Sequence, residues 1–150
     1  MKVVIIFEST HHGNTKKLLD AIAAKYDVEL IDATKIDAVD YEVYDMIGFA
    51  SGVAFGKFYK KVTSLAKSVP SGKKVFFIYS CGKNNKDYSE NIRTILEDGG
   101  CISLGTYGCN GYDTYGPMKL IGGINKGHPD EDEIAGAVSF YTSITKELIR

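Results

Sequence analysis

Unbroken apolar runs alternate with amphipathic segments along most of the chain. The opening run, Val3-Val4-Ile5-Ile6-Phe7, holds only β-branched and aromatic residues. That pattern is typical of a central parallel strand that is buried on both faces. Similar runs predict four further strands, over residues 28–31, 46–50, 74–79 and 101–107.

Between these runs, apolar residues recur at helical spacing and leave charged residues for solvent. The spacing predicts helices that begin at Asn14, near Phe58 and at Tyr88, and a last helix from Pro129 to about Ile149. Pro129 suits a first helical turn, and the acidic run that follows it suits the positive end of the helix dipole. Residues 32–44 are polar without clear periodicity and form either a loop or a short helix.

Five apolar strands that alternate with helices predict an α/β fold, with a parallel sheet covered by helices on both faces. No linker or repeat divides residues 1–150, so we expect one domain. Ligands of such sheets bind at the carboxyl ends of the strands. This rule selects four segments, at residues 9–15, 51–57, 80–87 and 109–115.

The composition excludes several classes of protein. The 150 residues carry a net charge of −1, so neither nucleic acid nor an anionic membrane is an expected partner. No stretch approaches the roughly 18 apolar residues of a membrane span, and the opening run is too short for a signal peptide. We therefore expect a cytoplasmic protein. The three cysteines lack a C-x-x-C spacing, which predicts free thiols without a disulfide or metal site.

The segment Ser9-Thr10-His11-His12-Gly13-Asn14-Thr15 joins the first strand to the first helix. Its N–H groups, its hydroxyls and the positive end of the helix suit a terminal phosphate. It has neither the triphosphate motif G-x-x-x-x-G-K-[ST] nor the dinucleotide motif G-x-G-x-x-G. The alternative is that these residues only cap the helix. Glu8 would repel a phosphate, so we expect its side chain to point away.

These features resemble the flavodoxin family, and the resemblance covers essentially the whole chain. Its motif is Gly13-Asn14-Thr15, which matches the end of that family's phosphate loop. The resemblance implies a flavodoxin-like three-layer doubly wound sandwich. Its five-stranded parallel sheet has the order 2-1-3-4-5 and binds FMN where the strand order reverses. One departure is that His11 and His12 replace the family's usual threonine and lengthen the loop by one residue. Either histidine would add positive charge near a phosphate when protonated.

The resemblance also implies which residues bind the cofactor. The expected FMN-binding residues are Ser9, Thr10, His11, His12, Gly13, Asn14, Thr15, Ser51, Gly52, Val53, Ala54, Phe55, Gly56, Ser80, Cys81, Gly82, Cys109 and Tyr112. Phe55 is expected to contact the flavin ring and Phe58 to pack in the core. The second flavin loop lacks the family's large aromatic residue. The cysteines serve as small fillers, and the long connection over 108–128 is expected to be functional or to bind a partner.

Charge is segregated along the chain. Residues 46–86 contain eight lysines and no acid, whereas residues 27–45 contain seven acids and one lysine. Lys57, Lys83 and Lys86 lie in or beside the expected flavin loops, which predicts a positive rim. Flavodoxins are usually acidic there. A positive rim would stabilise negative charge on the reduced flavin and make its low-potential couple less negative than in acidic relatives.

The sequence thus predicts an FMN-binding electron-transfer protein without catalytic residues of its own, which serves a redox partner protein or a small electron acceptor. One alternative is an NAD(P)H-dependent FMN quinone reductase, an oxidoreductase that takes NAD(P)H at the lysine rim. Another is a flavin-free flavodoxin-like binding domain. A phosphoacceptor receiver is excluded because Ser51 stands where an aspartate is needed, and a Cys-x5-Arg phosphatase because residue 87 is Asp87.

Overall fold

The computed structural model describes residues 1–149 and shows a sheet whose parallel strands run in the order β2-β1-β3-β5-β6. Along the chain these are the first to fifth parallel strands in the order 2-1-3-4-5, as expected. A short strand, β4, pairs antiparallel with the end of β3. The strands are β1 Val3–Glu8, β2 Glu29–Asp32, β3 Met46–Ala54, β4 Lys57–Phe58, β5 Lys74–Cys81 and β6 Ile102–Asn110.

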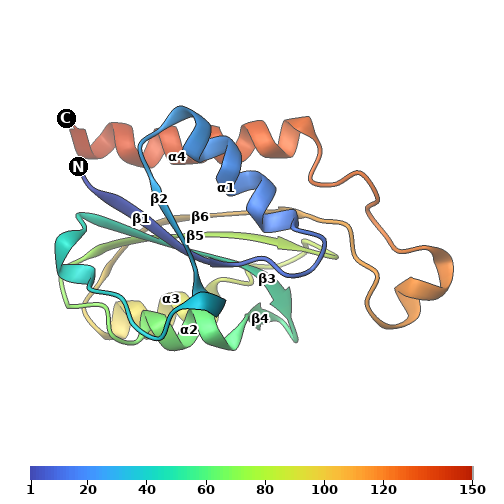
Figure 1. The fold of residues 1–150 in the computed structure, drawn as a ribbon, viewed down its shortest axis with the longest axis horizontal. Coiled ribbons are helices and arrows are strands. Elements are labelled where there is room, and N and C mark those ends of the chain that lie inside the picture. Colours follow the sequence, from blue (N-terminus) through green and yellow to red (C-terminus); the bar gives the residue numbers. More distant parts are fainter. Residues whose placement is uncertain (150) are drawn as a thin grey trace.

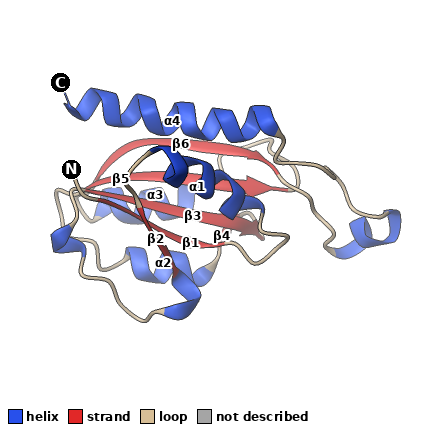
Figure 2. Ribbon diagram, turned by 45° about the horizontal axis from the view of Figure 1, so that its top comes forward, coloured by secondary structure: helices blue, strands red, loops and turns tan. Residues whose placement is uncertain are grey.

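Four α-helices cover the sheet, two on each face (Figure 1). They are α1 Asn14–Lys25, α2 Lys60–Ala66, α3 Glu90–Asp98 and α4 Glu131–Ile149. Helices α1 and α4 lie on one face, and α2 and α3 lie on the other (Figure 2). No helix in residues 1–149 is long and apolar enough to cross a membrane.

Alternation along β1 separates two hydrophobic cores. Val4 and Ile6 join the core beneath α2 and α3, whereas Val3, Ile5 and Phe7 join the core beneath α1 and α4. A strand buried on both faces requires apolar residues at every position, because successive side chains point to opposite faces. The apolar run of β1 is therefore unbroken because the sheet lies between two layers of helices.

Several predicted boundaries need correction. The polar stretch between β2 and β3 forms two 3₁₀ turns, Ala33–Lys35 and Tyr41–Val43, and no α-helix. Phe58 lies in β4 rather than in a helix, although it is buried in the core as expected. Helix α4 begins at Glu131, two residues after Pro129. The pattern of apolar residues does not predict the β3–β4 hairpin, because β4 has only two residues.

The connection between β6 and α4 extends away from the sheet and contains a 3₁₀ helix, Gly116–Ile121 (Figure 1). Its two sides are joined by an isolated bridge between Asp113 and Ile124. We call residues 111–124 the arm. Because the arm follows the carboxyl end of β6, it lies beside the loops that follow β1, β3 and β5.

Candidate functional site

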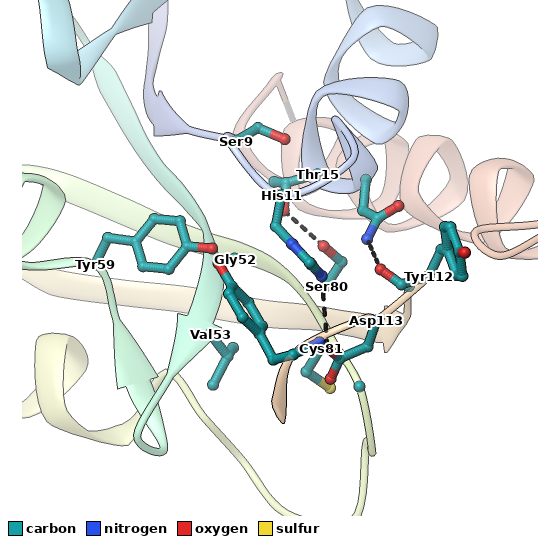
Figure 3. Close-up of a pocket in the computed structure, with 14 residues that line it drawn as sticks. Ser9, His11, Thr15, Gly52, Val53, Tyr59, Ser80, Cys81, Tyr112 and Asp113 are labelled. Atoms are coloured by element: carbon teal, nitrogen blue, oxygen red, sulfur yellow. Dashed lines mark hydrogen bonds and ion pairs between the residues drawn. The ribbon is translucent and has the colours of Figure 1, made fainter. Parts of the chain in front are cut away.

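A cavity opens at the carboxyl ends of β1, β3, β5 and β6, where the order of the sheet reverses between β1 and β3 (Figure 3). Its residues come from the β1–α1 loop, the β3–β4 hairpin, the end of β5 and the arm. They are Ser9, His11, Asn14, Thr15, Gly52, Val53, Tyr59, Ser80, Cys81, Gly82, Gly111, Tyr112, Asp113 and Tyr115.

The β1–α1 loop brings polar groups to the first turn of α1. Gly13 is the N-cap at φ 64° and provides no side-chain cap. The Ser9 hydroxyl accepts the N–H of Lys16 at 2.9 Å. The Thr15 hydroxyl is hydrogen-bonded to that of Ser80 at 2.7 Å, which ties the helix start to β5. The first turn of a helix can bind an anion through its backbone N–H groups, although here Ser9 already accepts the N–H of Lys16.

Asn14 joins this loop to the arm. Its Nδ2 donates to the carbonyl of Tyr112 at 2.8 Å. Its Oδ1 is buried and has no hydrogen-bond partner among the described residues. A Cβ on Gly111 would lie 2.7 Å from Asn14 Nδ2, so only glycine lets the arm approach this closely.

The residue between β4 and α2, Tyr59, lines the cavity, whereas Phe55 of the β3–β4 hairpin does not. Ser51 is buried, and its hydroxyl accepts the N–H of Tyr59 at 2.9 Å. A Cβ on Gly52 would lie 2.6 Å from the Tyr59 hydroxyl, so this glycine makes room for the ring. Burial raises the pKa of Tyr59 to about 12, and the nearby Tyr115 adds to the shift. The phenol is therefore neutral at pH 7.

The end of β5 places a cysteine in the cavity. Burial raises the pKa of the Cys81 thiol to about 12, so the thiol is neutral and unreactive at pH 7. Cys109 lies on the neighbouring strand opposite Ser80. Cys81 belongs to the core beneath α2 and α3, whereas Cys109 belongs to the opposite core. The two thiols therefore point to opposite faces of the sheet.

Two histidines attach the arm to the β1–α1 loop. His11 stacks on Tyr115 with ring centroids 3.9 Å apart, and His12 stacks on Tyr112 at 4.3 Å. The N–H of Thr114 donates to His11 Nε2 at 3.2 Å, and the hydroxyl of Thr114 is 3.0 Å from His12 Nε2. His11 can accept this N–H only while Nε2 is unprotonated.

One acid faces the cavity. Asp113 Oδ1 lies 3.5 Å from His11 Nε2 (Figure 3). Burial lowers the pKa of His11 and the neighbouring His12 lowers it further, although Asp113 opposes both. His11 thus favours the neutral form. Glu8 does not line this cavity, and burial together with Asp32 raises its pKa.

The arm nearly fills the cavity. The enclosed free volume is about 20 Å³, which is room for about one water molecule. Sites for drug-sized ligands have volumes of roughly 300 Å³ or more. A flat cofactor therefore requires side chains that line the cavity, such as Tyr59, Tyr112 and Tyr115, to move outward.

The structure brings ten of the expected binding residues to the cavity, namely Ser9, His11, Asn14, Thr15, Gly52, Val53, Ser80, Cys81, Gly82 and Tyr112. Eight others do not line it, namely Thr10, His12, Gly13, Ser51, Ala54, Phe55, Gly56 and Cys109. Phe55 lies at the hairpin tip and is fully exposed. Gly13 and His12 still shape the neighbouring loop.

Four cavity residues were not among those expected from the sequence, namely Tyr59, Gly111, Asp113 and Tyr115. Three of them belong to segment 109–115, which the strand-end rule had selected. Tyr59 belongs to no selected segment. The signal for it was Gly52, because a glycine inside a strand marks a close approach by another group.

A cluster outside the cavity contains metal-ligand residue types. Ligand atoms of His128, Asp130 and Glu133 lie within 4.8 Å of one another. Asp130 and Glu133 exchange N–H-to-carboxylate bonds at 2.9 Å, and Glu133 also contacts His128. This reciprocal pair is a capping box, so these carboxylates already serve to begin α4.

Sequence comparison finds two matches. A family model of the flavodoxin domain matches residues 4–100. An uncharacterized protein of Methanocaldococcus jannaschii is 37% identical over 149 residues, which is 97% of this chain and 99% of that protein.

Comparison with solved structures shows the same fold. A flavodoxin from the domain Archaea has a TM-score of 0.68 at 15% identity, and the match covers 100% of both chains. A flavoprotein from Lactobacillus acidophilus, solved in complex with FMN, has a TM-score of 0.56 at 20% identity. That match covers 73% of this chain and 92% of the other.

Proposed function

The chain belongs to the flavodoxin family, and from this premise we propose that it is an FMN-binding electron-transfer protein. The start of α1 carries the proposal, because it places the positive end of the helix and the Ser9 and Thr15 hydroxyls beside the cavity. These donors suit a terminal phosphate. The shared fold of the Lactobacillus flavoprotein, which holds FMN, supports the same cofactor.

The buried Asn14 Oδ1 is a second argument for this fit. A buried acceptor without a donor costs about 1–3 kcal/mol. A ligand with hydroxyl groups, such as the ribityl chain of FMN, supplies donors for such an atom. The residues at the start of α1 thus fit both the phosphate and the polyol part of FMN.

Electron chemistry would come from the bound flavin, and the chain would supply position and charge. The β1–α1 loop would hold the phosphate, while Gly52 and Gly82 leave room for the side chains of Tyr59 and Asp113 at the cavity. Tyr59 and Cys81 are neutral at pH 7 because their pKa values are about 12. Asp113 is the acidic residue among those that line the cavity.

In this proposal, Lys57, Lys83 and Lys86 beyond the cavity influence the reduction potential of the bound flavin. They favour negative charge on the reduced cofactor, although solvent weakens each contribution. We expect the low-potential couple to be less negative than in acidic flavodoxins, and increasingly similar to theirs as salt is added. A redox titration at two ionic strengths measures this. A couple at or below the acidic ones would refute the electrostatic argument.

The test of the proposal is a fluorescence titration of the flavin-free protein with FMN and, in parallel, with riboflavin, which lacks the phosphate. We expect FMN fluorescence to be quenched on binding, and riboflavin to bind at least about tenfold more weakly, because charge-assisted hydrogen bonds to the phosphate are lost. Equal affinity for the two flavins would show that the β1–α1 loop does not bind the phosphate.

The nearly filled cavity favours a second candidate, a flavin-free binding domain, and the same titration separates the two. If neither flavin is quenched, this second candidate replaces the first. If FMN binds and NADPH alone rapidly bleaches it, the protein is instead a reductase. Slow bleaching by NADPH with rapid reduction by a chemical reductant supports the electron carrier.

A further inference from the structure

The tip of the β3–β4 hairpin carries a phenylalanine that folding does not favour. Ala54 pairs with Lys57, so Phe55 and Gly56 form a two-residue loop with φ values of 53° and 77°. Such loops prefer Asn-Gly or Asp-Gly, because a bulky residue at positive φ is strained. The Phe55 side chain is also 104% exposed. Strain and exposure at one residue point to a contact made outside the chain.

Three lysines surround this phenylalanine. Lys57 and Lys86 line a groove between the hairpin and α3, and Lys60 lines an adjoining hollow with Phe55 and Lys57. All three lysines are exposed. Within residues 1–149, no carboxylate lies within 4 Å of their ammonium groups, whereas Lys61 pairs with Asp37 at 3.5 Å. We call Phe55, Lys57, Lys60 and Lys86 the hairpin surface.

Two acids, Asp87 and Glu90, line the same groove as Lys57 and Lys86. Asp87 is ion-paired with Arg93, and Glu90 is in the first turn of α3. Glu8 lines the hollow beneath Phe55, and burial raises its pKa. Because Arg93 neutralises Asp87, the three lysines outnumber the acids of the groove and hollow that have no ion pair among residues 1–149, namely Glu8 and Glu90.

The hairpin surface adjoins the cofactor cavity. Strand β3 contributes Gly52 and Val53 to the cavity and continues to Ala54 at the hairpin turn. Phe55 lies two residues beyond Val53, which is about 7 Å of extended chain. A protein that docks on Phe55 would thus lie close to a cofactor in the cavity.

We propose that the hairpin surface is the docking site of an acidic electron-transfer protein. Carboxylates of that partner face Lys57, Lys60 and Lys86, and an apolar patch receives Phe55. A central aromatic anchor with charges around it combines affinity with fast, salt-sensitive association. The purpose of the docking rests on the proposed function, but the docking itself needs no flavin.

The test therefore begins with isotopically labelled protein without FMN. An acidic plant-type [2Fe–2S] ferredoxin serves as the probe, and the basic cytochrome c of mitochondria serves as the probe of opposite charge. NMR titration should show amide shifts concentrated in residues 54–60 and 83–88 with the ferredoxin, and these shifts should diminish as salt is added. Cytochrome c should leave these amides unchanged.

Two sets of substitutions isolate the contacts. Lys57→Gln, Lys60→Gln and Lys86→Gln together should weaken ferredoxin binding about tenfold. The matched control is Lys25→Gln, Lys67→Gln and Lys146→Gln, which has the same net charge and lies at the other ends of the helices. This control should bind as the parent does. Phe55→Asn should weaken binding while the hairpin remains folded, because Asn-Gly suits this loop.

Each other outcome overturns the proposal. If both lysine sets weaken binding equally, net charge alone attracts the probe. If shifts cluster elsewhere, or the ferredoxin does not bind, the hairpin surface is not the docking site. If NADPH shifts the same amides instead, the groove is a nucleotide site. Failure of FMN to bind in the separate flavin titration would refute the proposed cofactor without affecting these results.

Discussion

The two walls of the cavity differ in how they are held. The wall built by α1 and β5 is buried, and the Thr15–Ser80 hydrogen bond lies at its centre. The wall built by the arm is largely exposed, and ring stacks of Tyr112 and Tyr115 on the two histidines attach it. The first wall is part of the hydrophobic core, whereas the second is docked onto it. Stability therefore resides in one wall and adjustability in the other.

A matched pair of leucines tests this difference most strongly. Leu19 of α1 is fully buried, whereas Leu120 of the arm is 89% exposed. Leu19→Ala should lower the free energy of unfolding by about 2–5 kcal/mol, because it removes packed methyl groups and leaves a cavity. Leu120→Ala should change it by less than about 0.5 kcal/mol. Urea denaturation measures both, and similar losses would show that the arm is part of the cooperative core.

The hydroxyl pair inside the fixed wall should have an intermediate effect. Ser80→Ala leaves the buried Thr15 hydroxyl without its partner, which should cost about 1–3 kcal/mol. Adding Thr15→Val removes the unpaired hydroxyl and should recover part of that loss. The double variant is the control, measured by the same urea denaturation. A double variant that is less stable than Ser80→Ala would mean that the threonine has another role.

Acid should affect the docked wall while the core stays intact, and this is the smallest of the three effects. The pKa of His11 is lowered from 6.5 in the docked arrangement. The undocked state therefore takes up protons first, so docking is complete above pH 6.5 and weakens as the pH falls below it. The facing groups are His12, Asp113 and the phenols of Tyr112 and Tyr115. The NMR signals of the Thr114 amide and the Tyr115 ring report the change.

A second histidine provides the control for this pH effect. Hydrogen bonding to Glu133 raises the pKa of His128. His128 therefore stabilises the folded state below pH 6.5, and this stabilisation is lost as the pH rises through the raised pKa. The pH dependence is thus opposite to that of His11. The acid transition should disappear in His11→Gln and persist in His128→Gln. A transition unchanged by His11→Gln would assign the opening of the arm to another group.

The same difference between the walls explains what the sequence could predict. The strand runs and the order of elements report local structure and packing, and they led to the α/β fold and the first wall. The sheet order came instead from the family resemblance that Gly13-Asn14-Thr15 carries. Ten of the expected residues line the cavity because they lie in the segments that the strand-end rule selects.

The arm could not be predicted because its contacts join distant parts of the chain. His11 and Thr114 are 103 residues apart, and Asn14 and Tyr112 are 98 apart. No local pattern specifies such pairs. Phe55 was expected to contact the flavin; the two-residue hairpin loop exposes its ring to solvent, outside the residues that line the cavity. That turn depends on the pairing of Ala54 with Lys57 across a two-residue strand, which has too few positions to show alternation.

The small free volume behind the arm has a kinetic consequence. If a cofactor enters only while the arm is open, its loading should be limited by that loop motion rather than by diffusion. The observed rate of FMN uptake should rise with FMN concentration and then level off at the opening rate of the arm. Once the arm has closed again, the same barrier should slow the escape of a bound cofactor.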